Sequence, residues 1–258
     1  MFHGLEGSSQ SHYCESFADY AYRNNLDFAV VHFRGCSGTV NLAPRAYHSG
    51  DFEEIAWILQ RFKIKTKSSV IAIGVSLGGN ALLRWAEEFG KSASKVVKAV
   101  VAVCSPIDLA AGGRHIGVGF NKIVYTRRFL NTMKPKALLK LKQYPGLFDR
   151  EALLRAHDLH SFDNVFTAPL HGFKNTEDYW KRCSAKPYLN QIKIPALVIN
   201  TKNDPFIPVA CLPRAHEVGQ WVRLWQPIQG GHVGFAAGPY PGHLDELPIN
   251  VMQWVSAL

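Results

Sequence analysis

The feature that most constrains this chain is Gly74-Val-Ser-Leu-Gly78, a G-x-S-x-G motif placed between two apolar runs. Residues 70–75 have the composition of a buried strand, and residues 81–89 that of a helix. A serine flanked by glycines between a strand and a helix is typical of a sharp turn that exposes the serine hydroxyl. Glycines are needed there because side chains would collide with the neighbouring backbone. The motif therefore predicts Ser76 as a nucleophile.

Apolar strand-like runs and amphipathic helix-like runs alternate on both sides of this motif. Further strands are expected at residues 28–33, 96–104, 196–201 and 222–228, and helices at residues 11–24, after Asp51, at 213–218 and at 244–255. Such alternation is typical of a mostly parallel sheet with helices on both faces. The predicted fold class is therefore α/β.

Residues 107–188 interrupt the alternation. They contain short helical pieces, such as residues 136–142 and 149–159, separated by proline, glycine and aromatic residues. Open parallel sheets bind ligands beyond the carboxyl ends of their strands. We therefore expect residues 107–188 to form a helical lid over that edge, and residues 1–106 and 189–258 to form the core.

Composition restricts the class of protein. Hydrophobic residues make up 47% of the 258 residues and charged residues 19%, as in an ordinary globular protein. No apolar run approaches the ~18 residues of a membrane span, and the first residues do not resemble a signal peptide. The five cysteines are widely spaced and form no C-x-x-C pair, so neither a disulfide framework nor a zinc site is indicated. We expect a cytoplasmic protein that needs no cofactor.

The net charge of +9 is concentrated in one segment. Residues 114–186 contain 14 Lys and Arg against 6 Asp and Glu, a surplus of eight. One interpretation is a solvated helical surface, and the other is attraction to an anionic membrane. No known nucleic-acid-binding motif accompanies the charge, so nucleic acid is not an expected partner.

A serine hydroxyl needs a base to accept its proton, and that base needs an acidic partner. His232 lies in the glycine-rich loop Gln229-Gly-Gly-His-Val-Gly-Phe235, just after the last expected strand. Asp204 follows the strand at residues 196–201. The order Ser76, Asp204, His232 is typical of folds with this serine turn. Asp108 is the main alternative acid, because it follows the strand at residues 96–104, and Asp245 is a third.

The tetrahedral intermediate of acyl transfer needs two N–H donors for its oxyanion. The backbone N–H of Leu77, directly after the nucleophile, is the first candidate. The loop His3-Gly-Leu-Glu-Gly7 has the H-G pattern that supplies the second donor in such enzymes, and Leu5 is the candidate within it.

Five segments form a combined pattern: His3-Gly-Leu-Glu-Gly-Ser8, Phe33-Arg-Gly-Cys-Ser-Gly38, Asn41-Leu-Ala-Pro-Arg-Ala-Tyr-His-Ser-Gly-Asp51, Gly74-Val-Ser-Leu-Gly-Gly-Asn80 and Asn203-Asp-Pro-Phe206. Together they resemble the YheT-like hydrolases, the AB hydrolase type 4 branch of the α/β-hydrolase superfamily. The resemblance implies an α/β-hydrolase fold and a serine esterase acting on short-chain or lipid-like acyl esters. It also implies that Ser76, Asp204 and His232 form a catalytic triad.

The resemblance leaves other features open. Arg34, Arg45, Tyr47 and His48 belong to the family signature, and we expect them to anchor the loop beside the serine turn. The resemblance also implies strands before His3, one of them between the strands at residues 28–33 and 70–75, so unpaired backbone groups are expected there. A non-catalytic protein that binds a ligand or partner, and an acyltransferase with the same triad, are the alternative functions.

Overall fold

Four parallel strands form the sheet of this protein, and they lie side by side in the order in which they occur in the chain. They are β1 Ile71–Val75, β2 Ala99–Val103, β3 Ala196–Ile199 and β4 Val222–Trp225. The structure is a computed structural model that describes residues 1–258. Because every neighbouring pair of strands is parallel, all carboxyl ends lie at the same edge. The predicted α/β class is confirmed.

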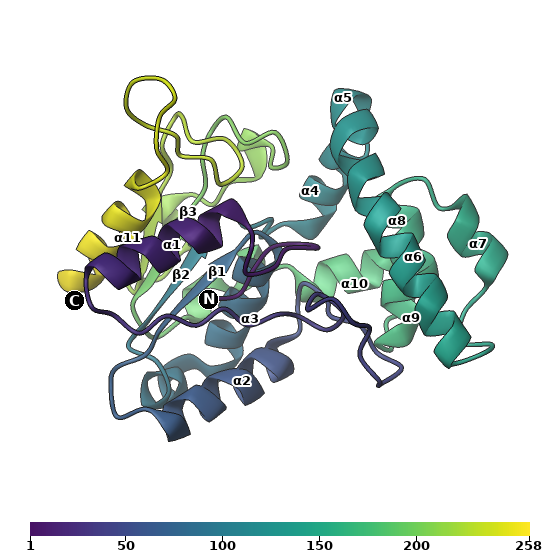
Figure 1. Ribbon diagram of the computed structural model, residues 1–258, viewed down its shortest axis with the longest axis horizontal. Helices are drawn as coiled ribbons and strands as arrows, with labels where there is room; N and C mark the ends of the chain where they lie inside the picture. Colours follow the sequence, from purple (N-terminus) through teal and green to yellow (C-terminus); the bar gives the residue numbers. More distant parts are fainter.

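The sheet is buried on both faces, and alternate residues of each strand point to opposite sides. Ala72, Val100 and Val198 face the helices α2 Phe52–Lys65 and α3 Leu77–Phe89. Ile73 and Val101 face α1 His12–Arg23 and α11 Glu246–Ser256. Figure 1 shows these two pairs of helices on opposite sides of the strands. The sheet is therefore the middle layer of three.

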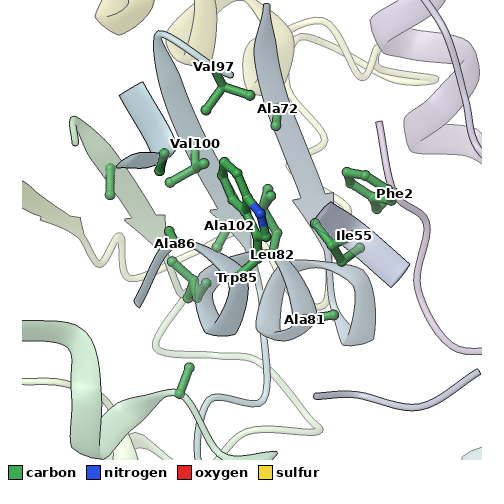
Figure 2. Close-up of a cluster of buried hydrophobic side chains, with 14 of the residues drawn as sticks. Phe2, Ile55, Ala72, Ala81, Leu82, Trp85, Ala86, Val97, Val100 and Ala102 are labelled. Carbon is green, nitrogen blue, oxygen red and sulfur yellow. The ribbon is translucent and has the colours of Figure 1, made fainter. Parts of the chain in front are cut away.

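The larger of the two core clusters lies between α3 and the sheet and contains 25 buried residues. In Figure 2 the indole of Trp85 lies between the α3 ribbon and the strands, with Leu82 beside it. Both side chains are completely inaccessible to solvent. This packing fixes α3, whose first residue follows Ser76, against the sheet. The position of the serine turn thus depends on well-packed apolar contacts.

The expected strand at residues 28–33 is wrong, because only Val31 makes an isolated bridge, and its partner is Phe2. Phe2 lies between this extended segment and β1. Its N–H donates to the carbonyl of Ile73 (2.8 Å), and its carbonyl accepts from the N–H of Val75 (2.9 Å). Part of the expected gap is therefore filled. The segment is bound to this N-terminal stretch by the Val31 N–H, which donates to the carbonyl of Met1 (3.0 Å), and by the carbonyl of Ala29, which accepts from the Met1 amino group (2.6 Å).

The expected helix at residues 213–218 is also wrong. Only a single 3-10 turn forms, at Ala215–Glu217, where the carboxylate of Glu217 accepts from the N–H of Arg214 at 2.7 Å. The backbone is extended on both sides of this turn, at Arg214 and at Val218, so no further helical turn follows.

Between β2 and β3 the chain forms a group of helices that lies beyond one end of the strands (Figure 1). They are α4 Leu109–Ile116, α5 Gly119–Asn121, α6 Arg127–Gln143, α7 Arg150–Arg155, α8 Leu159–Phe162, α9 Ala168–Leu170 and α10 Thr176–Cys183. Two π-helical turns, η2 Lys122–Thr126 and η3 Asp163–Thr167, join α5 to α6 and α8 to α9. None of the helices combines the length and apolar content needed to cross a membrane.

Candidate active site

Ser76 lies in a strained turn between β1 and α3, with φ 52° and ψ −121°. The turn is held because the Ser76 N–H donates to the carbonyl of Val103 at 2.8 Å. A Cβ at Gly74 would lie 2.5 Å from the carbonyl oxygen of Gly78, and one at Gly78 would lie 2.5 Å from that of His3. Both distances are far below contact, so only glycine fits on either side of the serine.

Ser76, His232 and Asp204 form a continuous chain of hydrogen bonds. His232 Nε2 lies 3.1 Å from the Ser76 hydroxyl oxygen. On the other side of the ring, Nδ1 lies 2.9 Å from Asp204 Oδ2 and 3.1 Å from Oδ1. The three residues come from the loops that follow β1, β3 and β4. They meet because the carboxyl ends of parallel strands share one edge.

The acid and the histidine are each fixed by further contacts. Asp204 is 6% exposed, and its Oδ1 also accepts from the N–H of Phe206 at 2.8 Å. The Phe206 ring packs against the imidazole of His232, with 4.1 Å between centroids. The loop that carries His232 is tied down where the Gly231 N–H donates to the side chain of Asn203 at 2.8 Å. The packing of Phe206 on His232 and the hydrogen bond between Gly231 and Asn203 could not be inferred from the sequence, because each depends on how two distant loops fold together.

The two alternative acids lie elsewhere. Asp108 caps α4 by accepting from the N–H of Ala111 at 3.0 Å. Asp245 lies at the start of α11, 3.6 Å from Arg23 and 3.9 Å from His243. Neither carboxylate contacts His232.

The two expected oxyanion donors border the same pocket as Ser76. Leu77 is the first residue of α3, so its N–H has no acceptor within the helix. The loop that carries Leu5 passes close to the serine, because a Cβ on Gly4 would lie 3.1 Å from the Ser76 Cβ. This loop is held by a hydrogen bond from the Gly4 N–H to the hydroxyl of Tyr13, 2.9 Å long.

Glu6, directly after Leu5, joins this loop to the helices between β2 and β3. Its backbone has φ 57°, and its N–H donates to the Tyr47 hydroxyl at 2.9 Å. That hydroxyl donates in turn to Glu6 Oε1 at 2.8 Å. Lys136 Nζ, on α6, lies 2.9 Å from Glu6 Oε2. Sequence reasoning missed this contact, because Glu6 and Lys136 are 130 residues apart with no motif to connect them.

The other signature residues connect the loop before α2 to α2 itself and to the helices between β2 and β3. Arg34 pairs with Glu54 at 2.9 Å, and Arg45 pairs with Asp51, the N-cap of α2. His48 is buried among aromatic rings, and burial lowers its pKa to about 3. These contacts are structural, and none of the three side chains touches Ser76.

A largely apolar pocket of about 160 Å³ opens beside Ser76. It lies between the core loops and the helices at residues 107–188. Its apolar lining includes Leu5, Leu77, Pro106, Leu109, Ile116, Phe129, Met133, Ala137, Leu159, Phe162, Phe166, Trp180, Phe206 and Ile207. An elongated apolar group bonded to a carbonyl at Ser76 would fit such a lining.

Other reactive groups are not gathered into a site. No group of three or more His, Cys, Asp or Glu side chains is placed to bind a metal ion. All five cysteines are free and buried, and burial raises the pKa of the Cys104 and Cys183 thiols to about 12.

Comparison with known proteins identifies the family. The family model described as "alpha/beta hydrolase fold" matches residues 1–239. The chain belongs to the α/β-hydrolase family. It is 37% identical over 241 residues to the candidate esterase YheT of Escherichia coli (strain K12), a match covering 92% of this chain and 70% of YheT. The α/β-hydrolase fold and the resemblance to YheT are confirmed.

More distant relatives extend this comparison. The chain is 25% identical to the mouse monoacylglycerol lipase ABHD2 over 277 residues, a match covering 99% of this chain and 64% of that protein. Among solved structures, Est1E of Butyrivibrio proteoclasticus, determined with ferulic acid bound, has a TM-score of 0.59 at 13% identity. That match covers 99% of this chain and 86% of Est1E and shows the shared fold. The chain thus spans less than two thirds of the mouse relative.

Proposed function

We propose that this α/β-hydrolase cleaves carboxylic esters through an acyl-enzyme formed on Ser76. The observation that carries the proposal is the hydrogen-bonded chain from Ser76 through His232 to Asp204 beside an apolar pocket. Such a chain activates a serine hydroxyl and has little use in a protein that only binds a ligand.

The reaction proceeds in two steps. His232 Nε2 accepts the hydroxyl proton as the Ser76 oxygen attacks the ester carbonyl, and the N–H groups of Leu5 and Leu77 stabilise the oxyanion. The histidine then gives its proton to the alcohol oxygen as the carbon–oxygen bond breaks. A water molecule, deprotonated by the same nitrogen, then attacks the acyl-enzyme, and the histidine returns that proton to the Ser76 oxygen as the bond to the acyl carbon breaks and the acid is released. Asp204 holds the ring and stabilises its charged form, and no cofactor takes part.

The pocket supports an acyl ester with an extended apolar chain as the substrate class. Its lining is dominated by aliphatic and aromatic side chains, and the ion pair of Glu6 with Lys136 is among its charged groups. The names of relatives such as the mouse monoacylglycerol lipase are in line with lipid-like esters. A cytoplasmic location is proposed with it, since five free cysteines suit a reducing compartment.

The decisive experiment is labelling with a fluorophosphonate probe, which reacts with activated serines. We expect stoichiometric labelling of the wild type and none of Ser76→Ala. Ser105→Ala serves as a control, because Ser105 is buried close to the serine turn but makes no contact with His232. Absence of labelling in a folded wild type would overturn the proposal and favour the non-catalytic alternative.

Substrate class and acceptor need a second measurement. For p-nitrophenyl esters of increasing acyl length, kcat/KM should rise for as long as the added carbon atoms contact the apolar lining of the pocket. Product analysis in the presence of glycerol would distinguish hydrolysis, which yields free acid, from acyl transfer, which yields a new ester.

A further inference from the structure

The segment from Val118 to Arg128 exposes an unusual run of large apolar side chains. Val118 is 61% exposed, Phe120 72%, Ile123 68% and Val124 40%. Residues 120, 123 and 124 are spaced by three and four positions in α5 and η2, so they share one face of a continuous helix. Four such side chains within seven positions form an exposed apolar patch, and such patches mark interaction sites.

The same helical face becomes basic one turn later. Arg127 and Arg128, seven and eight positions after Phe120, are exposed and have no acidic partner. Residues 109–148 contain eight Lys and Arg and no Asp or Glu. The apolar patch is therefore bordered by positive charge that no neighbouring carboxylate neutralises.

We propose that this face of residues 118–128 docks onto an anionic lipid surface. Apolar side chains enter the boundary between head groups and acyl chains, while the flanking arginines pair with negatively charged head groups. A second copy of this chain fits less well, because two such faces would bring the unneutralised basic runs together. The proposal concerns binding and does not require the catalytic activity.

The opposite side of this segment contacts the candidate active site. The side-chain amide of Asn121 donates to the carbonyl of Pro205 at 2.6 Å. The ring of Tyr125 packs edge-on against Phe206, with 4.6 Å between centroids, and Phe206 packs against His232. One face of η2 is thus free for a membrane while the other lies against the residues next to Asp204. Docking would hold the active site close to lipid esters.

The test measures co-sedimentation with sucrose-loaded vesicles. Neutral vesicles contain phosphatidylcholine alone, and anionic ones also contain phosphatidylglycerol. We expect the wild type to bind anionic vesicles at least tenfold more tightly than neutral ones, and binding to weaken in high salt. Arg127→Glu with Arg128→Glu should lower anionic binding at least tenfold, and Phe120→Ser with Ile123→Ser should lower it by a similar factor.

Matched controls separate the patch from general surface properties. Lys91→Glu with Lys95→Glu makes the same charge change before β2, at the opposite edge of the sheet, and should change binding less than threefold. Tyr22→Ser with Leu26→Ser removes two other exposed apolar side chains and should have equally little effect. Hydrolysis of a soluble ester by the patch variants should match the wild type and shows that they fold.

Three outcomes would overturn the proposal. They are equal binding to both vesicle types, patch variants that bind like the controls, and a wild type that binds neither vesicle. A fourth outcome comes from light scattering after size exclusion. If the wild type is a dimer and the patch variants are monomers, a second copy of the chain covers the face of residues 118–128, and the proposal is wrong. Vesicle binding by Ser76→Ala should be unchanged, so loss of catalysis cannot be mistaken for loss of docking.

Discussion

The sheet core and the helices between β2 and β3 are built in contrasting ways. In the core, strands buried on both faces pack into two clusters of 25 and 14 residues. The helical region has smaller clusters of 6 and 5 residues, two π-helical turns and several exposed apolar side chains. The core supplies Ser76, Asp204 and His232, whereas the helical region supplies half of the residues that line the pocket.

This difference assigns separate tasks to the two regions. A triad works only if its atoms stay within hydrogen-bond distance, and dense packing around short parallel strands provides that precision. A pocket wall and a docking face need shape and surface chemistry, which loosely connected helices can provide. Changes in the core should therefore alter the chemical step and stability, and changes in the helical region should alter selectivity and binding.

The largest expected effect comes from the core. Asp204→Asn should lower kcat by roughly 10³–10⁴-fold, because the amide would hold the wrong tautomer of His232. Steady-state kinetics on a p-nitrophenyl ester measure the effect. Asp108→Asn, at the start of the helical region, should stay within a factor of three of the wild type. Equal losses in both variants would contradict the assignment of Asp204 and the division between the regions.

Glycine substitutions compare packing in the two regions. Gly78→Ala should destabilise the protein by about 3 kcal/mol, because its Cβ would lie 2.5 Å from the His3 carbonyl oxygen in the core. In Gly112→Ala in α4, the added Cβ would lie 3.3 Å from the Pro106 Cβ and an ordinary 3.8 Å from the Phe206 carbonyl oxygen, and helix propensity partly offsets the tighter contact. The free energy of unfolding of this variant should change by less than about 1 kcal/mol. Urea denaturation measures both, and similar changes would show that the regions are packed alike.

One buried group in each region, His3 in the core and Asp163 in the helical region, should contribute to the pH dependence of stability with opposite signs. Burial lowers the pKa of His3, in the core, from 6.5 to about 4. Between these values only the unfolded chain binds the proton, so this contribution to stability is lost as pH falls through that window. Burial raises the pKa of Asp163, in η3, from 3.8 to about 6. Between these two values only the folded protein holds the proton on Asp163. The stabilisation that this proton binding provides is therefore lost as pH rises from about 4 to about 6.

Urea unfolding between pH 5 and 7.5 tests these signs. His3→Gln should remove about 2 kcal/mol of the loss on acidification, although buried His48 contributes in the same direction. Asp163→Asn keeps an acceptor for the Trp180 indole N–H, 2.9 Å from Asp163, and should steepen the net loss on acidification. Slopes that match the wild type in both variants would contradict these assignments.

The smallest expected effect lies at the contact between the regions. Lys136→Met removes the ion pair with Glu6 and should lower kcat about fivefold, because the loop that carries the Leu5 N–H becomes less well held. Lys142→Met, on the same helix but without an acidic partner, should leave kcat unchanged. A change in KM alone for Lys136→Met would show that the ion pair shapes the pocket and does not position the oxyanion donor.

The sequence by itself determined the strand–serine–helix turn, the α/β class and the order of the candidate triad. These features are local, because a turn at φ 52° between packed backbones requires glycines at fixed positions and buried parallel strands require continuous apolar runs. The sequence also shows that the positive charge is concentrated in residues 114–186, although it does not indicate which part of that segment is exposed.

Only the tertiary structure decided which of three aspartates lies beside His232, that residues 28–33 are not a regular strand, and that Glu6 meets Lys136. It also decided that Phe120 and Ile123 face solvent while Phe129 and Phe206 line the pocket. Each outcome depends on which distant segment lies opposite a residue. Phe120 and Phe129 lie nine positions apart in the same helical stretch, yet only Phe129 lies close to the distant Phe206, so their burial is set by neighbours far away in the chain.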